Sequence, residues 1–186
     1  MFPIQPRSSY SYNVQFIITA DTPTDVDIIS KYAEINRTVV ITTGVAYIDI
    51  PTLAINLETG RTLITVMILA YQLITVVELF SKSYCKYNSP CESTSFIVLP
   101  FNKLGRQYSL TTYPKYHQNC GIMATATNTT SIIESASVLN ISVQGATINP
   151  SQKFKLVLDY LKGFNVNTDT NLTGTKFNAN KPIVVI

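Results

Sequence analysis

Short apolar segments recur along the chain, and turn-forming residues separate them. Val, Ile and Thr dominate the segments, while Gly, Pro and Asn lie between them. β-branched side chains favour pleated strands, and strand starts about 8–12 residues apart are typical of all-β proteins. The expected strands are Asn13–Ala20, Val26–Ser30, Thr38–Thr43, Val45–Ile50, Leu63–Leu69, Leu73–Leu79, Ser95–Leu99, Gln107–Thr112, Ile122–Thr127, Ser131–Glu134, Leu139–Val143, Phe154–Leu158, Gly174–Phe177 and Ile183–Ile186. Ser151–Leu161 also fits one amphipathic helix, but its length is marginal.

The most apolar stretch, Thr62–Phe80, predicts a strand pair rather than a membrane helix. Sixteen uncharged residues separate Arg61 from Glu78, whereas a spanning helix needs about 20. Most of these residues are β-branched, which favours strands. Ala70–Gln72 predicts the turn between the two strands.

A faint internal repeat bears on the architecture. Ile68–Val77 resembles Phe177–Ile186 at an offset of 109 residues, and Asn36–Ile41 resembles Asn128–Ile133 at an offset of 92. Repeated β units that cannot bury their own apolar faces stack on their neighbours. We therefore expect an all-β fold of antiparallel meander repeats, with a propeller-like arrangement favoured and a two-sheet β-sandwich as the alternative.

The length of 186 residues suits one domain. Met1–Tyr12 is polar, contains two prolines and shows no signal peptide, so we expect a disordered or strand-flanking segment there. Residues 13–186 are expected to form a single all-β module. The last segment, Pro182–Ile186, is a bare apolar strand, and natural domains usually cover such an edge. We therefore expect the module to be incomplete at its C-terminal end; the alternative is that this strand pairs internally.

Composition excludes several kinds of chemistry. Only 13% of residues are charged and the net charge is +3, which is too weak an excess to predict nucleic-acid binding. One histidine and three cysteines rule out a two-His metal site and a four-Cys zinc site, and no phosphate-binding loop is present. His117 lies three residues before Cys120, but such proximity is a weak indication of a nucleophile and its base. We predict no metal, no cofactor, no catalytic residue and no enzymatic activity.

The cysteines and sequons indicate an oxidising compartment. Cys85 and Cys91 flank a polar turn and are the candidate disulfide, which leaves Cys120 unpaired or available for an intermolecular bond. Two alternatives remain open: Cys120 pairs with one of the other two, or all three are reduced. The candidate N-glycosylation sites are Asn36, Asn128, Asn140 and Asn171.

Three segments carry a family resemblance. Asp169–Val185 is similar to a D-L-T-G-T core followed by a strand and K-P-[IV]-x-V, with Asn171 where Asp is common. Phe96–Tyr108 is similar to an apolar-L-P-x-x-x-L-G-x-x-Y pattern, and Ala126–Thr130 resembles A-x-D-N-T-T. In this order, these motifs resemble the N-terminal domain family of IgG Fc-binding protein. The resemblance extends from about Phe16 onward and implies an extracellular, non-enzymatic binding module, without implying that IgG is bound.

We therefore expect a recognition or adhesion module within a larger secreted or surface protein. Its partner would be an extracellular protein or glycan, or other modules of the same chain, and not nucleic acid. Tyr- and Asn-rich loops suit adaptable contact surfaces. A purely structural β-repeat spacer is the main alternative, and a β-propeller hydrolase is a more distant one.

Overall fold

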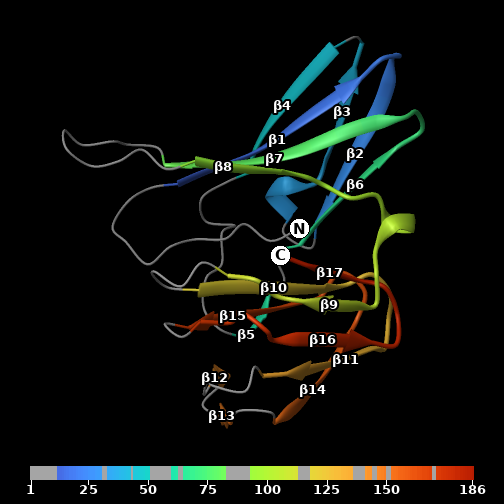
Figure 1. The fold of residues 1–186 in the computed structure, drawn as a ribbon. Helices are drawn as coiled ribbons and strands as arrows, with labels where there is room; N and C mark the ends of the chain where they lie inside the picture. The colour runs from blue at the N-terminus through green and yellow to red at the C-terminus, as the bar shows by residue number, and fades with distance from the viewer. Residues whose placement is uncertain are drawn as a thin grey trace, which may run out of the picture.

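The computed structural model describes residues 12–30, 33–42, 44–50, 60–62, 65–82, 93–112, 118–135, 141–143, 146–149, 152–168 and 171–186. Seventeen strands and two 3-10 turns make up the regular structure of these residues. The strands group into an N-terminal and a C-terminal sandwich, which Figure 1 shows one above the other. None of the described residues forms a helix long and apolar enough to cross a membrane.

The N-terminal sandwich has a four-stranded sheet in the order β4-β1-β7-β8 and a three-stranded sheet in the order β3-β2-β6. The four-stranded sheet contains β1 (Tyr12–Ala20), β4 (Gly44–Ile50), β7 (Ile74–Lys82) and β8 (Ser93–Ile97). The three-stranded sheet contains β2 (Thr24–Ser30), β3 (Arg37–Ile41) and β6 (Val66–Ala70), and the turn η1 (Ala33–Ile35) joins β2 to β3. All of these pairs are antiparallel.

Alternation of apolar and polar residues places one face of each sheet in a shared core. Along β2 buried positions alternate with more exposed ones, as the two-residue period of a strand requires. Phe16 and Ile18 of β1 pack in one cluster with Ile28 of β2, Ile41 of β3 and Ile48 of β4. Because this cluster joins residues of both sheets, the sheets pack face to face.

The C-terminal sandwich repeats this plan. One sheet has the order β17-β10-β15-β5 and contains β5 (Gly60–Thr62), β10 (Gln118–Ala124), β15 (Gly163–Thr168) and β17 (Ile183–Val185). The other has the order β14-β11-β16-β9 and contains β9 (Gln107–Ser109), β11 (Thr129–Glu134), β14 (Lys153–Leu158) and β16 (Lys176–Ala179). A hairpin of β12 (Ile141–Val143) and β13 (Ala146–Ile148) lies between β11 and β14 in sequence.

The core of this sandwich also draws on both sheets. Ile122, Phe164 and Ile183 from one sheet pack in a cluster with Leu158 and Phe177 from the other. Phe164 also lies near the ring of Phe154, with a centroid separation of 6.0 Å. Aromatic rings at this spacing interact favourably beyond the area that they bury.

The two sandwiches share one connectivity. In the first, β1 pairs with β4 and β7, and β2 pairs with β3 and β6. In the second, β10 pairs with β15 and β17, and β11 pairs with β14 and β16. The six strands correspond in chain order, and β6 and β7 correspond to β16 and β17, as the 109-residue repeat predicts. The 92-residue offset is wrong, because it matches β3 with β11 instead of β14.

The antiparallel all-β prediction is confirmed, and its sandwich alternative describes the arrangement of the sheets. The helical interpretation of Ser151–Leu161 is wrong over β14, which is extended. The apolar stretch does contain two strands with a bend at Tyr71 and Gln72. However, β6 and β7 join opposite sheets and are not a pair. The inner faces of both sheets of a sandwich must be apolar. A continuous run of apolar residues can therefore supply one strand to each sheet, instead of two paired strands to the same sheet.

Among the described residues, hydrogen bonds and apolar packing connect the two sandwiches, and Ile186 of the second packs against the core of the first. The Thr65 hydroxyl donates to the Leu161 carbonyl at 2.6 Å in a buried position, and the Tyr160 hydroxyl donates to the Met67 sulfur at 2.9 Å. Met123 and Leu161 of the second sandwich form a small buried cluster, against which Ile29 and Met67 of the first pack. A short apolar seam therefore connects the units.

Candidate binding site

An apolar cleft of about 580 Å³ lies between the two sandwiches. We call it the inter-sandwich cleft. Its wall from the first sandwich comes from β6, β7 and β8, and its wall from the second comes from β10, β17 and the Tyr160–Leu161 turn. No charged side chain of the described residues lines it. A cavity of this size and polarity is typical of a binding site.

Large apolar side chains around the cleft are unusually exposed. Leu73, in the bend before β7, is 88% exposed, Ile97 and Leu99 are 64% and 57% exposed, and Phe101 is 58% exposed. Isolated exposed apolar residues are common, but a group around a hollow marks an interaction site. These residues therefore form the apolar rim of the cleft.

Three of the four polar side chains that line the cleft, those of Tyr108, Thr125 and Tyr160, are already engaged within the protein. The Thr125 hydroxyl donates to the Pro182 carbonyl, the Tyr108 hydroxyl donates to the Ile183 carbonyl, and the Tyr160 hydroxyl donates to Met67. A ligand would consequently meet mainly hydrocarbon, so the cleft suits apolar groups rather than sugars or ions.

The side wall of the cleft is the connection from β8 to β9, which descends at one end of both sandwiches (Figure 1). Pro100 precedes the 3-10 turn η3 (Phe101–Lys103), and Leu104 ends it with its backbone N–H donating to the Phe101 carbonyl. Pro100 is extended, with a φ of −66° that lies in the narrow range its ring allows. The turn thereby presents Phe101 and Leu104 to the cleft.

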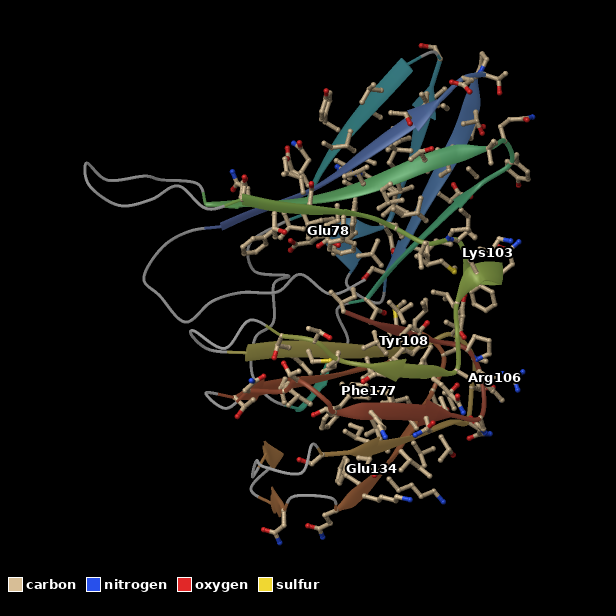
Figure 2. The ribbon with its side chains drawn as sticks, in the orientation of Figure 1. Glu78, Lys103, Arg106, Tyr108, Glu134 and Phe177 are labelled. Carbon is tan, nitrogen blue, oxygen red and sulfur yellow. The ribbon has the colours of Figure 1, made fainter. Side chains whose placement is uncertain are left out.

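Tyr108 braces this connection against the last strand. Its hydroxyl accepts the Gly105 backbone N–H at 2.8 Å and donates to the Ile183 carbonyl at 2.8 Å. The Gly105 Cα lies against the Tyr108 ring, because a Cβ there would meet the ring at 3.5 Å. The backbone of Ile183 donates in turn to the Gly105 carbonyl. Figure 2 shows Tyr108 on β9, close to the gap between the sandwiches.

We expect Tyr108→Phe to destabilise the protein by about 1–3 kcal/mol, because one hydroxyl serves two backbone groups that would lose their partner. Urea unfolding measures the change. Tyr160→Phe is the matched control, since its hydroxyl contacts only a weak sulfur acceptor in a partly exposed position. Equal small losses in both variants would contradict a bracing role for Tyr108.

The segment Asn171–Thr175 folds as a hydrogen-bonded turn beside β16. Asn171 Oδ1 accepts from the Thr173 backbone N–H at 2.8 Å and from the Thr112 hydroxyl at 2.9 Å. Gly174 has a φ of 90°, a conformation that side chains disfavour. Leu172 is buried in the core. An Asp at position 171 could accept the same two bonds, so the Asn in this position preserves the turn.

The segment Ala126–Thr130 forms the turn between β10 and β11. The Thr129 hydroxyl donates to the Ala126 carbonyl at 2.6 Å, and Asn128 has a φ of 52°, which Asn tolerates better than most residues. Asn180 Oδ1 accepts from the Thr130 backbone, and Lys181 donates to the Thr127 carbonyl. The motifs that carry the family resemblance are therefore structural: they build the lower sandwich and one wall of the cleft.

The structure separates the candidate modification sites. Asn36 and Asn128 are exposed and Asn171 is half-buried. Asn36 Oδ1 accepts from the Ser30 backbone at 2.5 Å. Asn140 lies outside the described residues. None of these three described sequons lies in the cleft lining.

Of the three cysteines, only Cys120 lies within the described residues. Cys85 and Cys91, and also His117, lie outside the described residues. Cys120 is a buried thiol in β10, and its desolvation raises its pKa to about 12. Such a thiol is a poor nucleophile, and its sulfur reaches an outside partner only if the sandwich opens.

Glu78 is a buried acid that sequence reasoning treats only as the end of an apolar run. It is 2% exposed on β7, where it lies opposite Phe16 on one side and Phe96 on the other. Its Oε2 atom has no hydrogen-bond partner in the described part of the chain. Desolvation raises the pKa of Glu78 from 4.5 to about 8. In Figure 2 it lies on the upper sandwich.

Comparison with known proteins gives one family. The model of the family described as IgGFc binding protein matches residues 94–186. No curated protein and no solved structure matches. The matched residues include the connection from β8 to β9, the whole of both resembling turns and all strands of the second sandwich except β5. This family consists of binding domains rather than enzymes.

Sequence reasoning missed the cleft, and a partial signal for it existed. Leu99 and Phe101 are apolar residues on either side of Pro100. The segment that contains them is too short for other strands to cover both of its faces. The sequence alone, however, could not show that Leu73 lies near them, because the two positions are brought together only by the packing of two sandwiches.

Proposed function

Because this chain belongs to the IgGFc binding protein family, we propose that it is an extracellular, non-enzymatic recognition module of a larger secreted or surface protein. We further propose that residues 13–186 act as one module and that the inter-sandwich cleft binds an apolar segment of a partner protein. The observation that carries the proposal is the apolar rim of exposed Leu73, Ile97, Leu99 and Phe101 around an uncharged hollow.

The chemistry of the cleft favours a protein as the partner. Protein interfaces are centred on apolar and aromatic anchors that enter desolvated pockets. The cleft offers Met67, Met123 and Phe101 as soft and aromatic contacts, and methionine adapts to different partner shapes. Beside it, β8 is an edge strand whose outer side has no partner strand among the described residues, so an extended segment could also pair along it.

The walls of the cleft are held firmly, which suits recognition. Tyr108, η3 and the Thr65–Leu161 hydrogen bond fix the relative positions of the rim residues. A site that is already formed loses less conformational freedom on binding. The family assignment supports binding as the activity, and the sequons support exposure to the secretory pathway.

The test uses two probes on the full chain: an immobilised IgG Fc fragment, which the family description suggests, and a phage-displayed peptide library. We expect capture of Fc or enrichment of peptides rich in aromatic and aliphatic residues. Leu73→Ser should weaken the selected interaction about tenfold, the loss expected when roughly 1.4 kcal/mol of apolar contact is removed. Surface plasmon resonance measures the change.

Val40→Ser is the matched control. Val40 is 67% exposed on β3 and does not line the cleft, so its replacement should leave binding unchanged. If neither probe is captured, or if both variants bind like the original chain, the cleft is not a recognition site. A structural spacer would then describe the module better.

A further inference from the structure

A second surface lies on the outer face of the sheet β14-β11-β16-β9, whose strands β11 and β14 lie low in the lower sandwich of Figure 1. Lys153 and Lys155 of β14 and Lys176 of β16 are exposed there. Lys155 lies opposite Ile132, Lys153 opposite Glu134, and Glu134 opposite Lys176. We call these residues and their outward neighbours the lysine face. Figure 2 shows Glu134 on this sheet, well away from the gap between the sandwiches.

The lysine face has a regular layout because each strand shows every second residue on one side. One row across the sheet runs Lys153, Glu134, Lys176 and Ser109, and the next runs Lys155, Ile132, Asn178 and Gln107. Lys153 and Lys155 are about 7 Å apart along their strand, and Lys153 and Lys176 are about 10 Å apart across two strand spacings. Each row therefore starts with a lysine on β14 and ends with a polar residue on β9, with Glu134 or Ile132 between them on β11.

Charge on this face is mostly unbalanced. Glu134 is its one acid among the described residues, and it lies 3.9 Å from Lys153 in a largely exposed pair, which is worth little. Residues 98–186 contain 8 basic and 3 acidic residues, whereas residues 1–97 contain 6 basic and 8 acidic ones. The C-terminal half of the chain therefore carries the positive charge of the molecule.

The corresponding face of the first sandwich has the opposite sign. It is the outer side of β3-β2-β6, where Asp25 lies opposite Val40, and Asp27 lies opposite Thr38 and Leu69. The two faces occupy equivalent positions in the repeated topology. The lysines are consequently a property of one sandwich and not of the fold.

We propose that the lysine face binds an anionic polysaccharide. Lysines act as point charges for sulfate or carboxylate groups, and Asn178, Gln107 and Ser109 can exchange hydrogen bonds with sugar hydroxyls. A protein partner would need large anchors, and single-stranded nucleic acid would need aromatic platforms. The outward residues of these four strands include no aromatic side chain. The proposal concerns a second surface and is independent of the inter-sandwich cleft.

The experiment measures binding of the full chain to immobilised heparin, a sulfated polysaccharide, at increasing salt. We expect the combined Lys155→Gln and Lys176→Gln variant to lose about 20-fold in affinity, since one lysine near an anionic surface accounts for roughly fivefold. We expect Glu134→Gln to bind about two- to fivefold more tightly, because it removes the opposing charge. Binding should weaken as salt rises.

The control variant combines Arg37→Gln with Lys103→Gln, which removes the same net charge from exposed positions elsewhere. It should change heparin affinity less than twofold. An equal loss in this control would overturn the proposal, because net charge alone would then explain binding. Equal or tighter binding of duplex DNA or polyglutamate would overturn the assignment to a polysaccharide. A Glu134→Gln variant that binds heparin with the same affinity as the original chain would overturn the assignment of binding to the lysine face.

Discussion

Glu78→Gln should make the protein more stable at pH 8 by roughly 4 kcal/mol, and should do little at pH 4. Burial raises the pKa of Glu78 from 4.5 to about 8, so between these values the folded chain keeps a proton that the unfolded chain releases. Stability then falls as pH rises through this window, by about 1.4 kcal/mol for each pH unit. Glutamine cannot ionise and removes the loss.

The measurement is urea unfolding of both proteins from pH 4 to pH 9. The informative quantity is the difference between variant and original chain, since other groups titrate equally in both. Glu34→Gln is the matched control, because it makes the same substitution at an exposed position in η1 and should not reproduce the effect of Glu78→Gln. If the difference between the Glu78→Gln chain and the original stays flat across this range, Glu78 is not the protonated group that we describe.

Glu78 illustrates what sequence can and cannot reveal. The pattern Ile74, Val76, Glu78 places the acid on the inward face once β7 is recognised as a strand. The free-energy cost of burying this acid depends on its neighbours. These are Phe16 and Phe96, which come from two strands that are far apart in sequence. Local pattern therefore predicts the direction of a side chain, whereas pairing partners decide its environment.

The same distinction holds for the fold as a whole. Alternation along β2 and β11 predicts strands correctly, because period and burial are local properties. The strand β15, which is absent from the expected strands, begins at Gly163 and contains three polar residues, so its propensity is weak. It is extended because it pairs with both β10 and β5. Such long-range pairing overrides local preference.

The candidate sites divide in a similar way. Sequons and cysteines are readable as motifs, although Cys85, Cys91 and Asn140 lie outside the described residues. The inter-sandwich cleft and the lysine face required the packing of distant strands. Lys155 and Lys176 are 21 positions apart in sequence, yet β11 brings their strands together. Neither spacing nor composition indicates that proximity.

Phe177→Ala should destabilise the second sandwich by about 3–5 kcal/mol, through the lost apolar contacts and the cavity that remains. Phe177 is 1% exposed in β16 and lies opposite Ile133 on one side and Tyr108 on the other. Figure 2 shows it on β16 in the lower sandwich. Urea unfolding monitored by circular dichroism measures the loss.

Phe101→Ala is the matched control for this substitution, because Phe101 is 58% exposed and its removal should cost under about 1 kcal/mol. The contrast tests whether the core lies between the sheet β14-β11-β16-β9 and the sheet β17-β10-β15-β5, which pack face to face. A similar cost for both phenylalanines would place Phe177 outside the core. A large loss of stability in Phe177→Ala alone would mean that the inward face of β16 is buried, as the repeated connectivity also requires.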